Sequence, residues 1–409
     1  MLKGKKKTAA HPDAALAQRG GAKVHFDHTD MDYYLSWILG RHFAEGADAE
    51  ECMEVARGVA DGDPASWQAA WPKLGERLER AAQADLDAGR REEARRAWLR
   101  ASTAFRAPLF IMSANDERLM PLAIRMRDCF RRAAALFDPP IEPVAVPFRG
   151  AVLDGYFHKA DASGGRRPLL IVVGGIETFA EDCWFMLGGE AARRGWHLLA
   201  IDLPGQGTTP AAGLHFEARM GPAVAAVLDH ALARPDVDPA RVALYGFSWG
   251  GHVVFKGAER ETRLAALIAN PAMPDVFRAA RAQQNNRVMG DPVGRQVFEQ
   301  IVWRFGLALS FRPSILRKRF AKVIDYLRHG KAKLRTLSCP VLCLAGEAEA
   351  PITLEIARGL KRKLRNRKSR VVVFTATEGG AAHCQVDNLA LPAHAIFDWL
   401  EEVAPRGRG

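Results

Sequence analysis

The stretch RVALYGFSWGG, residues 241–251, decides the fold. Its first half is a continuous apolar run, as expected of a strand that is buried on both faces of a parallel sheet. The run ends at Gly246-Phe247-Ser248-Trp249-Gly250, in which glycines flank a serine at alternate positions. Such glycines relieve crowding at a sharp turn from strand to helix, and the turn exposes the serine hydroxyl. We therefore predict a strand, a tight turn and a helix, with Ser248 as a nucleophile.

Similar apolar runs lie on both sides of this stretch, and helical stretches such as 185–195 and 222–235 separate them. Parallel strands need a crossover of this kind, because a tight turn cannot join them. The alternating segments 143–150 and 151–159 predict an antiparallel hairpin before the first buried run. We therefore expect a mostly parallel sheet with helices on both faces. The other apolar runs are PLLIVVGG (168–175), WHLLAIDLPG (196–205), ALIANPAM (266–273), CPVLCLAGE (339–347) and RVVVFTAT (370–377).

The chain before this α/β region is helical in pattern. Apolar residues recur at helical spacing from Met31 to Phe137, and the pair Pro139-Pro140 marks a boundary. We expect a mobile basic tail over 1–27, a helical lobe of four or five helices over 28–140, and the α/β region over 141–409.

A second helical segment interrupts the α/β rhythm between Asn270 and Cys339. It leaves the carboxyl end of a strand, where ligand sites of parallel sheets form, and it is too long for a simple connection. We predict a helical lid insertion over 271–337.

The candidate base and acid come from the end of the chain. A serine hydroxyl needs a base whose pKa lies near neutrality, and His383 lies in GGAAHCQ just after the last apolar run. A carboxylate should orient the imidazole. We favour Glu349, in the segment GEAEAP, because counting from Gly346 at the end of the preceding apolar run places it where the acid of this fold normally lies. Glu347 and Asp275 stay open as alternatives.

Two backbone amides are candidates for an oxyanion hole, which acyl transfer requires. One is the amide of Trp249, directly after the nucleophile. The other is the amide of Ile176, because Gly174 and Gly175 let the backbone of that turn come close. The neighbouring Glu177 is a candidate substrate contact, or alternatively a cap of the following helix. Asp202-Leu-Pro-Gly-Gln-Gly207 is interpreted as a structural turn.

Composition limits the remaining classes. No apolar run could cross a bilayer, no hydrophobic signal core follows the basic start, and six scattered cysteines indicate neither a disulfide framework nor a metal site. We expect a cytoplasmic protein without metal or organic cofactor, and no partnership with membrane or nucleic acid. The net charge of +11 favours encounters with anionic partners, such as an acidic carrier protein, but does not identify the partner.

From Val144 onward the chain resembles one α/β-hydrolase family. This family includes 2,6-dihydroxypseudooxynicotine hydrolase, the fungal polyketide-shortening hydrolases of pigment synthesis and the fermentation–respiration-switch esterase-like proteins. The resemblance rests on VPFRGAVLDGYFH, VVGGIETFAED, DLPGQG, GFSWGG and EGGAAHCQVDN.

The resemblance implies Ser248 as nucleophile, His383 as base and an Asp where this chain has Glu349, so the chain departs from the family pattern at the acid. It also implies that the helical lobe covers the site and assists formation of a homodimer.

The expected function is hydrolysis of a small molecule by a Ser–His–acid triad. The substrate is an ester, or an acyl ketone or aromatic ketone whose C–C bond is cleaved. Two alternatives remain: an acyltransferase or thioesterase that acts on an acidic carrier, and a non-catalytic binding protein that retains the fold.

Overall fold

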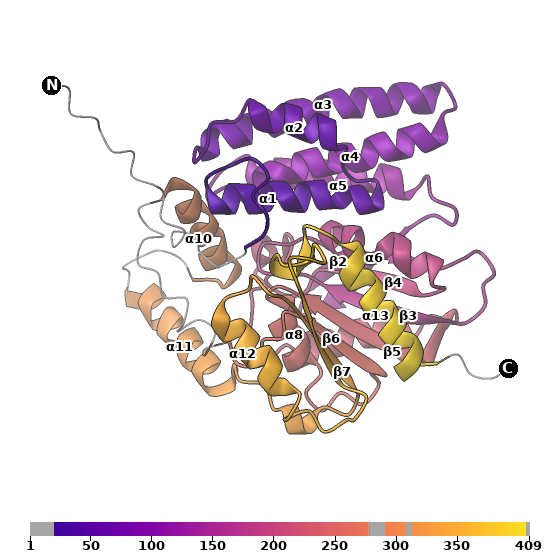
Figure 1. The fold of residues 1–409 in the computed structure, drawn as a ribbon, viewed down its shortest axis with the longest axis vertical. Helices are drawn as coiled ribbons and strands as arrows, with labels where there is room; N and C mark the ends of the chain where they lie inside the picture. The colour runs from indigo at the N-terminus through magenta and orange to yellow at the C-terminus, as the bar shows by residue number, and fades with distance from the viewer. Residues whose placement is uncertain (1–19, 277, 279–290, 308–312, 406–409) are drawn as a thin grey trace.

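The computed structural model describes residues 20–276, 278, 291–307 and 313–405 (Figure 1). Its centre is an eight-stranded sheet in the order β1-β2-β4-β3-β5-β6-β7-β8. The first three strands in this order pair antiparallel, and all later pairs are parallel. The strands are β1 (Glu142–Phe148), β2 (Ala151–His158), β3 (Arg167–Val173), β4 (His197–Ile201), β5 (Val237–Phe247), β6 (Ala266–Asn270), β7 (Val341–Gly346) and β8 (Arg370–Phe374). This is the mostly parallel sheet that the apolar runs predict.

The predicted hairpin is formed by β1 and β2. Phe148 pairs with Ala151, so only Arg149 and Gly150 make the turn. Both have positive φ, 49° and 78°, which matches the twist of a two-residue hairpin turn.

Helices cover both faces of the sheet, so its central strands are buried on both sides. In β3, Leu170 and Val172 belong to one hydrophobic core, and Leu169 and Ile171 belong to the other. The first core includes α6 (Ala180–Arg193) and α13 (Ala390–Val403), and the second includes α7 (Gly221–Leu232) and α8 (Gly250–Gly257). A further helix, α12 (Pro351–Leu360), lies between β7 and β8 in the chain. Continuous apolar strands arise because each face has its own core.

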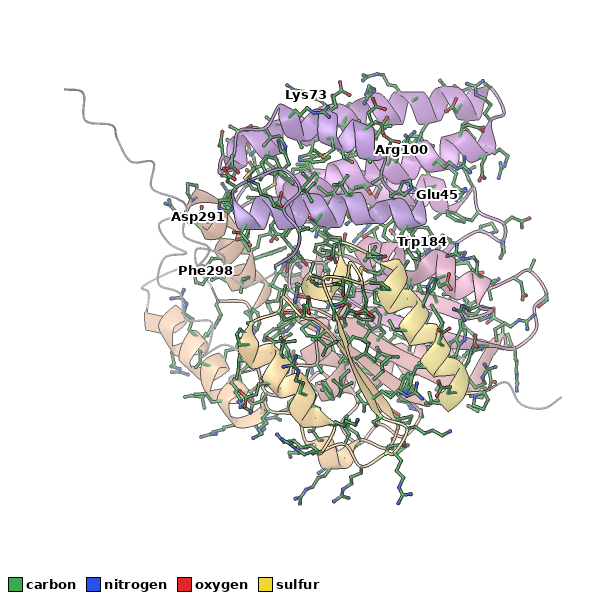
Figure 2. The ribbon with its side chains drawn as sticks, viewed as in Figure 1. Glu45, Lys73, Arg100, Trp184, Asp291 and Phe298 are labelled. Carbon is green, nitrogen blue, oxygen red and sulfur yellow. The ribbon has the colours of Figure 1, made fainter. Side chains whose placement is uncertain are left out.

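The helical lobe lies across one end of this α/β part (Figure 1). Its elements are α1 (Thr29–Gly40), the short 3-10 helix η1 (Arg41–Ala44), α2 (Ala49–Arg57), α3 (Pro64–Asp87), α4 (Arg91–Phe110) and α5 (Leu119–Ala134). Side chains of the lobe belong to the first core. The ring centroid of the buried Trp184, on α6, lies 5.3 Å from that of Phe130 and 5.4 Å from that of Phe137. Figure 2 shows Trp184 at this junction. We call this lobe the cap.

The insertion contributes α10 (Pro292–Arg304), which lies beside the cap in Figure 1, and α11 (Pro313–His329), which lies farther from it on the side of α12. Asp291 caps α10, because its carboxylate accepts the amides of Val293 and Gly294. The same carboxylate lies 3.1 Å from Nε2 of His28, which in turn caps α1 through Nδ1. One histidine–aspartate pair therefore joins the starts of a cap helix and an insertion helix.

Part of the predicted mobile tail, residues 1–27, makes contacts with the fold. Residues 1–19 of it lie outside the described residues, whereas residues 20–27 are attached to the fold through the buried Phe26, with residues 21–24 and Asp27 exposed. Phe26 is 3% exposed, and the amides of Val24, His25 and Phe26 donate to the carboxylate of Asp32. One buried aromatic residue and a carboxylate six to eight positions further along the chain hold this segment. Neither feature produces a periodic pattern in the sequence.

Candidate active site

Ser248 lies at the sharp bend between β5 and α8. Its φ is 55°, in the left-handed region, and its amide donates to the carbonyl of Asn270 at 2.6 Å. A Cβ at Gly250 would come within 2.5 Å of the carbonyl oxygen of Gly174, so the residue after the bend must be small. The glycines of the motif therefore permit the close contact that presents the serine side chain.

His383 lies on η5 (His383–Gln385), the short 3-10 turn that follows β8. Its Nε2 atom lies 3.0 Å from Oγ of Ser248, within hydrogen-bond distance, although 135 positions separate the two residues. The structure brings the predicted nucleophile and base together at one edge of the sheet.

Asn270, at the end of β6, links the loops that carry the serine and the histidine. Its carbonyl accepts both the Ser248 amide and the thiol of Cys384, the latter at 3.3 Å. Its side-chain amide donates to Oε1 of Gln385 at 2.9 Å. Both loops are therefore fastened to the same buried residue.

The carboxylate beside the histidine is that of Glu349. Its Oε1 lies 2.7 Å from Nδ1 of His383, and Glu349 is 5% exposed. The two alternatives face elsewhere. Glu347 is exposed and accepts the amide of Ala376, while Asp275 pairs with Lys331 at 3.5 Å.

The charge of this carboxylate acts on the histidine. Burial of the ring disfavours its protonated form, but the Cys384 side chain and the Glu349 carboxylate outweigh that effect. The pKa of His383 is consequently raised well above its ordinary value.

The loop after β3 passes directly over the serine. A Cβ at Gly175 would lie 2.9 Å from Oγ of Ser248, so only glycine leaves room for the nucleophile there. Among the described residues, the amides of Ile176 and Trp249 donate no hydrogen bond, which leaves both able to receive an oxyanion.

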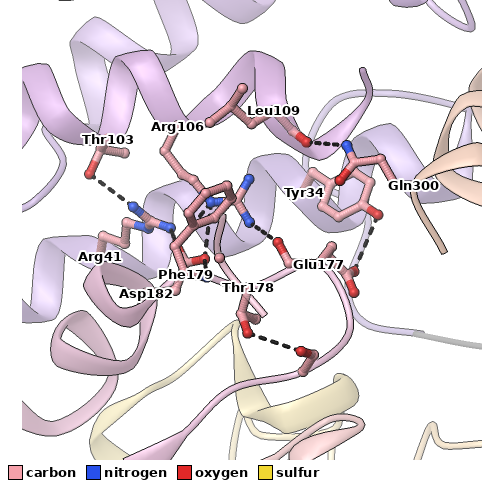
Figure 3. A network of polar contacts seen from close by, with 12 residues as sticks. Tyr34, Arg41, Thr103, Arg106, Leu109, Glu177, Thr178, Phe179, Asp182 and Gln300 are labelled. Atoms are coloured by element: carbon pink, nitrogen blue, oxygen red, sulfur yellow. Dashed lines mark hydrogen bonds and ion pairs between the residues drawn. The ribbon is translucent and has the colours of Figure 1, made fainter. Parts of the chain in front are cut away.

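Glu177 is 6% exposed, and the hydroxyl of Tyr34 lies 3.4 Å from its Oε1 (Figure 3). It does not cap α6, because the carboxylate of Asp182 accepts the amide of Phe179 at 2.9 Å and performs that role. The Glu177 carboxylate is therefore buried beside the turn that carries the Ile176 amide, with a cap tyrosine as its neighbour.

Several contributors to this site have no clear signal in the sequence. Gln206, part of a motif interpreted as a turn, is fully buried and donates to the carbonyls of Gly174 and Gly175. In the sequence, the signal that could have indicated this role is a polar side chain between two glycines, Gly205 and Gly207. Tyr33 comes from the cap, with its ring centroid 6.1 Å from that of His383, and nothing in the local sequence places it there.

In the described part of the chain, no cluster of three or more His, Cys, Asp or Glu side chains converges in a way that could hold a metal ion. All six cysteines are unpaired and buried. A search of the described helices finds none with the length and apolarity that a membrane span requires.

The sheet order and the bend that presents Ser248 define an α/β-hydrolase. The comparisons with known proteins go further: residues 46–289, more than half of the chain, match the family model described as "Esterase FrsA-like". The chain belongs to the FrsA-like esterase family, and it is a hydrolase, as its relatives are named. The resemblance inferred from the motifs is confirmed.

Two fungal relatives align over nearly their whole length. "Hydrolase ORFZ" of Pyricularia oryzae is 28% identical over 91% of this chain and 96% of its own length. "20-hydroxy-prefusarin hydrolase FUS2" of Gibberella moniliformis is 25% identical over 89% of this chain and 94% of its own. Among solved structures, 2,6-dihydroxy-pseudo-oxynicotine hydrolase matches with a TM-score of 0.70 and 20% identity, over 89% of this chain and 95% of that one. This last likeness concerns the fold, including the cap.

Proposed function

We propose that the protein is a serine hydrolase that cleaves an ester, or a C–C bond next to a ketone, in a small and partly aromatic substrate. The observation that carries the proposal is the continuous hydrogen-bonded series from Glu349 through His383 to Ser248, with separations of 2.7 and 3.0 Å. In this series the carboxylate fixes the imidazole tautomer, so that Nε2 faces the hydroxyl as an acceptor.

The chemistry follows from these contacts. Oγ of Ser248 adds to the substrate carbonyl while its proton moves to Nε2 of His383, and the amides of Ile176 and Trp249 hold the resulting oxyanion. Collapse of this intermediate breaks the bond to the leaving group, which takes the proton from His383. Water then attacks the acyl enzyme, His383 accepts the water proton, and the serine is regenerated as the acid is released.

Aromatic side chains from the cap support a substrate with a ring. Tyr33 lies beside His383, and Trp37 lies with its ring 6.3 Å from that of Phe247, which directly precedes the nucleophile. Glu177 is proposed to contact a polar group of the substrate. One relative is named 20-hydroxy-prefusarin hydrolase, and the hydroxy group in that name agrees with a site that contacts a polar group.

The test combines labelling with a substrate screen. A fluorophosphonate should label the wild type and not Ser248→Ala, because only the activated serine reacts. Aryl esters and β-diketones are then assayed with both proteins, and the preferred class identifies the scissile bond. A folded wild type that is neither labelled nor active would favour the binding protein instead. Transfer to an added alcohol or amine in preference to water would indicate the acyltransferase.

We also propose that the protein acts in the cytoplasm as a homodimer, because the resemblance assigns the cap a part in dimer formation. Sedimentation equilibrium of the full chain tests the dimer, since a mass near the 44.9 kDa of one chain would contradict it.

A further inference from the structure

The loop that carries Ile176 is fixed on its sheet side by two side chains. The amide of Gln206 donates to the carbonyls of Gly174 and Gly175, the latter at 3.3 Å. The hydroxyl of Thr178 donates to the carbonyl of Gly175 at 3.1 Å. These contacts hold the beginning of the loop but not its end.

The end of the loop is held by the cap. Arg106, on α4, is fully buried and its Nη2 donates to the carbonyl of Glu177 at 2.7 Å (Figure 3). Its Nε lies 3.1 and 3.0 Å from the two carboxylate oxygens of Asp182. Since Asp182 accepts the amide of Phe179, one guanidinium joins the carbonyl at residue 177 to the start of α6.

A second cap residue meets the same loop residue from its other side. Tyr34, on α1, approaches the Glu177 carboxylate with its hydroxyl, and its ring stacks on Phe110 with centroids 4.6 Å apart. The guanidinium of Arg106 lies 3.7 Å from the centroid of that Phe110 ring. Arg106, Phe110 and Tyr34 therefore form one packed unit, and it holds Glu177 by its carbonyl and by its side chain.

We propose that Arg106 and Tyr34 are positioning residues for the oxyanion hole, an inference that rests on the proposed function. The carbonyl that Arg106 holds belongs to the peptide between Glu177 and Thr178. The hydroxyl of Thr178 donates in turn to the carbonyl of Gly175, which shares its peptide unit with the proposed oxyanion amide of Ile176. Arg106 therefore restrains the direction of that amide through Thr178. An oxyanion donor works only when it is already aimed at the charge that develops. The cap is then part of the catalytic apparatus as well as a cover, because it supplies a partner for the Glu177 carbonyl and one for its carboxylate, whereas the α/β region holds the next residue, Thr178, through the Gly207 amide at 2.8 Å.

The chain offers a matched control for Arg106. Arg41 is also fully buried and pairs with the same carboxylate of Asp182, but its other hydrogen bond is to the hydroxyl of Thr103 at 3.4 Å. Its guanidinium lies 4.8 Å from the centroid of the Phe185 ring and 6.0 Å from that of Phe110, against 3.7 Å between Arg106 and Phe110. It touches no carbonyl of the oxyanion loop among the described residues. Arg41→Lys therefore disturbs the same buried ion pair without changing the hold on Glu177.

The experiment compares Arg106→Lys and Arg106→Gln with Arg41→Lys in the full-length protein. The readouts are kcat and KM for an aryl ester and the inhibition constant of phenylboronic acid, whose serine adduct mimics the tetrahedral intermediate. We expect the Arg106 variants to lose about 10- to 100-fold in kcat and a similar factor in boronate affinity, with little change in KM, because one donor of such a hole is worth about 100- to 1,000-fold. Arg41→Lys should stay within about threefold of the wild type on both measures.

Equal losses in the Arg41 and Arg106 variants, or a folded Arg106→Lys with normal kcat and boronate affinity, would overturn the inference while the proposed function stands. A wild type that is neither labelled nor active would instead defeat the proposed function. If neither Arg106 variant folds, Tyr34→Phe removes one hydroxyl from the same unit. It should lower kcat and boronate affinity together by about three- to tenfold, and unchanged values would contradict the inference.

Discussion

Nδ1 of His383 lies 2.7 Å from Oε1 of Glu349, and both residues are buried. The acid reaches the imidazole from the loop after β7, and the side chain two residues earlier in the same loop turns away to the Ala376 amide. One loop therefore supplies two glutamates with opposite surroundings, and this contrast makes the proposed role of Glu349 testable.

Glu349→Gln should lower kcat by about 1,000- to 10,000-fold, because the amide no longer stabilises the imidazolium or selects the correct tautomer. Glu347→Gln and Asp275→Asn should stay within about threefold of the wild type, since neither carboxylate faces His383. Steady-state kinetics on an aryl ester measures all three variants. A comparable loss in Glu347→Gln or Asp275→Asn would reassign the acid.

The acidic limb of the pH profile should lie above the ordinary range of histidine. His383 must be unprotonated to accept the serine proton, so a raised pKa means that kcat/KM is lost at a higher pH as the pH falls. Replacement of Glu349 by Gln removes a group that favours the imidazolium, and the limb should move to lower pH. The profile of kcat/KM against pH for both proteins measures the shift, and an unmoved or alkaline-shifted limb in the variant would contradict the assignment.

Gly175→Ala should abolish most activity with little loss of structure. The added methyl would lie 2.9 Å from Oγ of Ser248 and would displace either the serine or the loop. We expect kcat/KM to fall by about 100-fold or more, as a displacement of about 1 Å at a reacting group does. Gly189→Ala is the control, because its new Cβ has no neighbour nearer than a flexible Arg193 side chain at 4.0 Å. Equal activity of the two variants would contradict the prediction, because the loop after β3 would then move to accept the methyl group without displacing Ser248.

The native thiols should resist alkylation. Burial raises the pKa of Cys52, Cys339 and Cys343 to about 12, so at pH 8 these side chains are almost entirely protonated as well as inaccessible. Iodoacetamide should leave activity unchanged over an hour, whereas all six cysteines should react after unfolding in guanidinium chloride. Mass spectrometry counts the adducts, and rapid modification of the folded protein would contradict the buried placement.

The sheet was predictable because strands buried on both faces appear as continuous apolar runs, and each of the runs becomes a strand. The bend at Ser248 was equally clear, since its glycines are required locally. The acid could be placed only by counting from Gly346, and the sequence alone left three carboxylates open. Glu349 and Glu347 differ in the direction of their side chains, which depends on how the loop after β7 folds. Asp275 lies in a different loop, after β6, where it pairs with Lys331.

The part of the site that the cap contributes could not be predicted. Arg106 lies 76 positions from Asp182, and its helix has an ordinary apolar pattern in which an arginine is normally solvated. Its burial depends on a partner from another part of the chain, and such a pairing leaves no periodic signal. For the same reason, the positions of Tyr33, Tyr34 and the buried Phe26 could not be predicted.

The left-handed backbone at Ser248 makes the residue that the proposed reaction requires differ from the residue that would stabilise the fold most. A side chain held at φ 55° is strained by roughly 1–3 kcal/mol, and glycine would adopt that geometry freely. Selection for heat tolerance alone would therefore tend to erase the nucleophile, so a thermostable variant found by a folding screen should be sequenced first at residue 248.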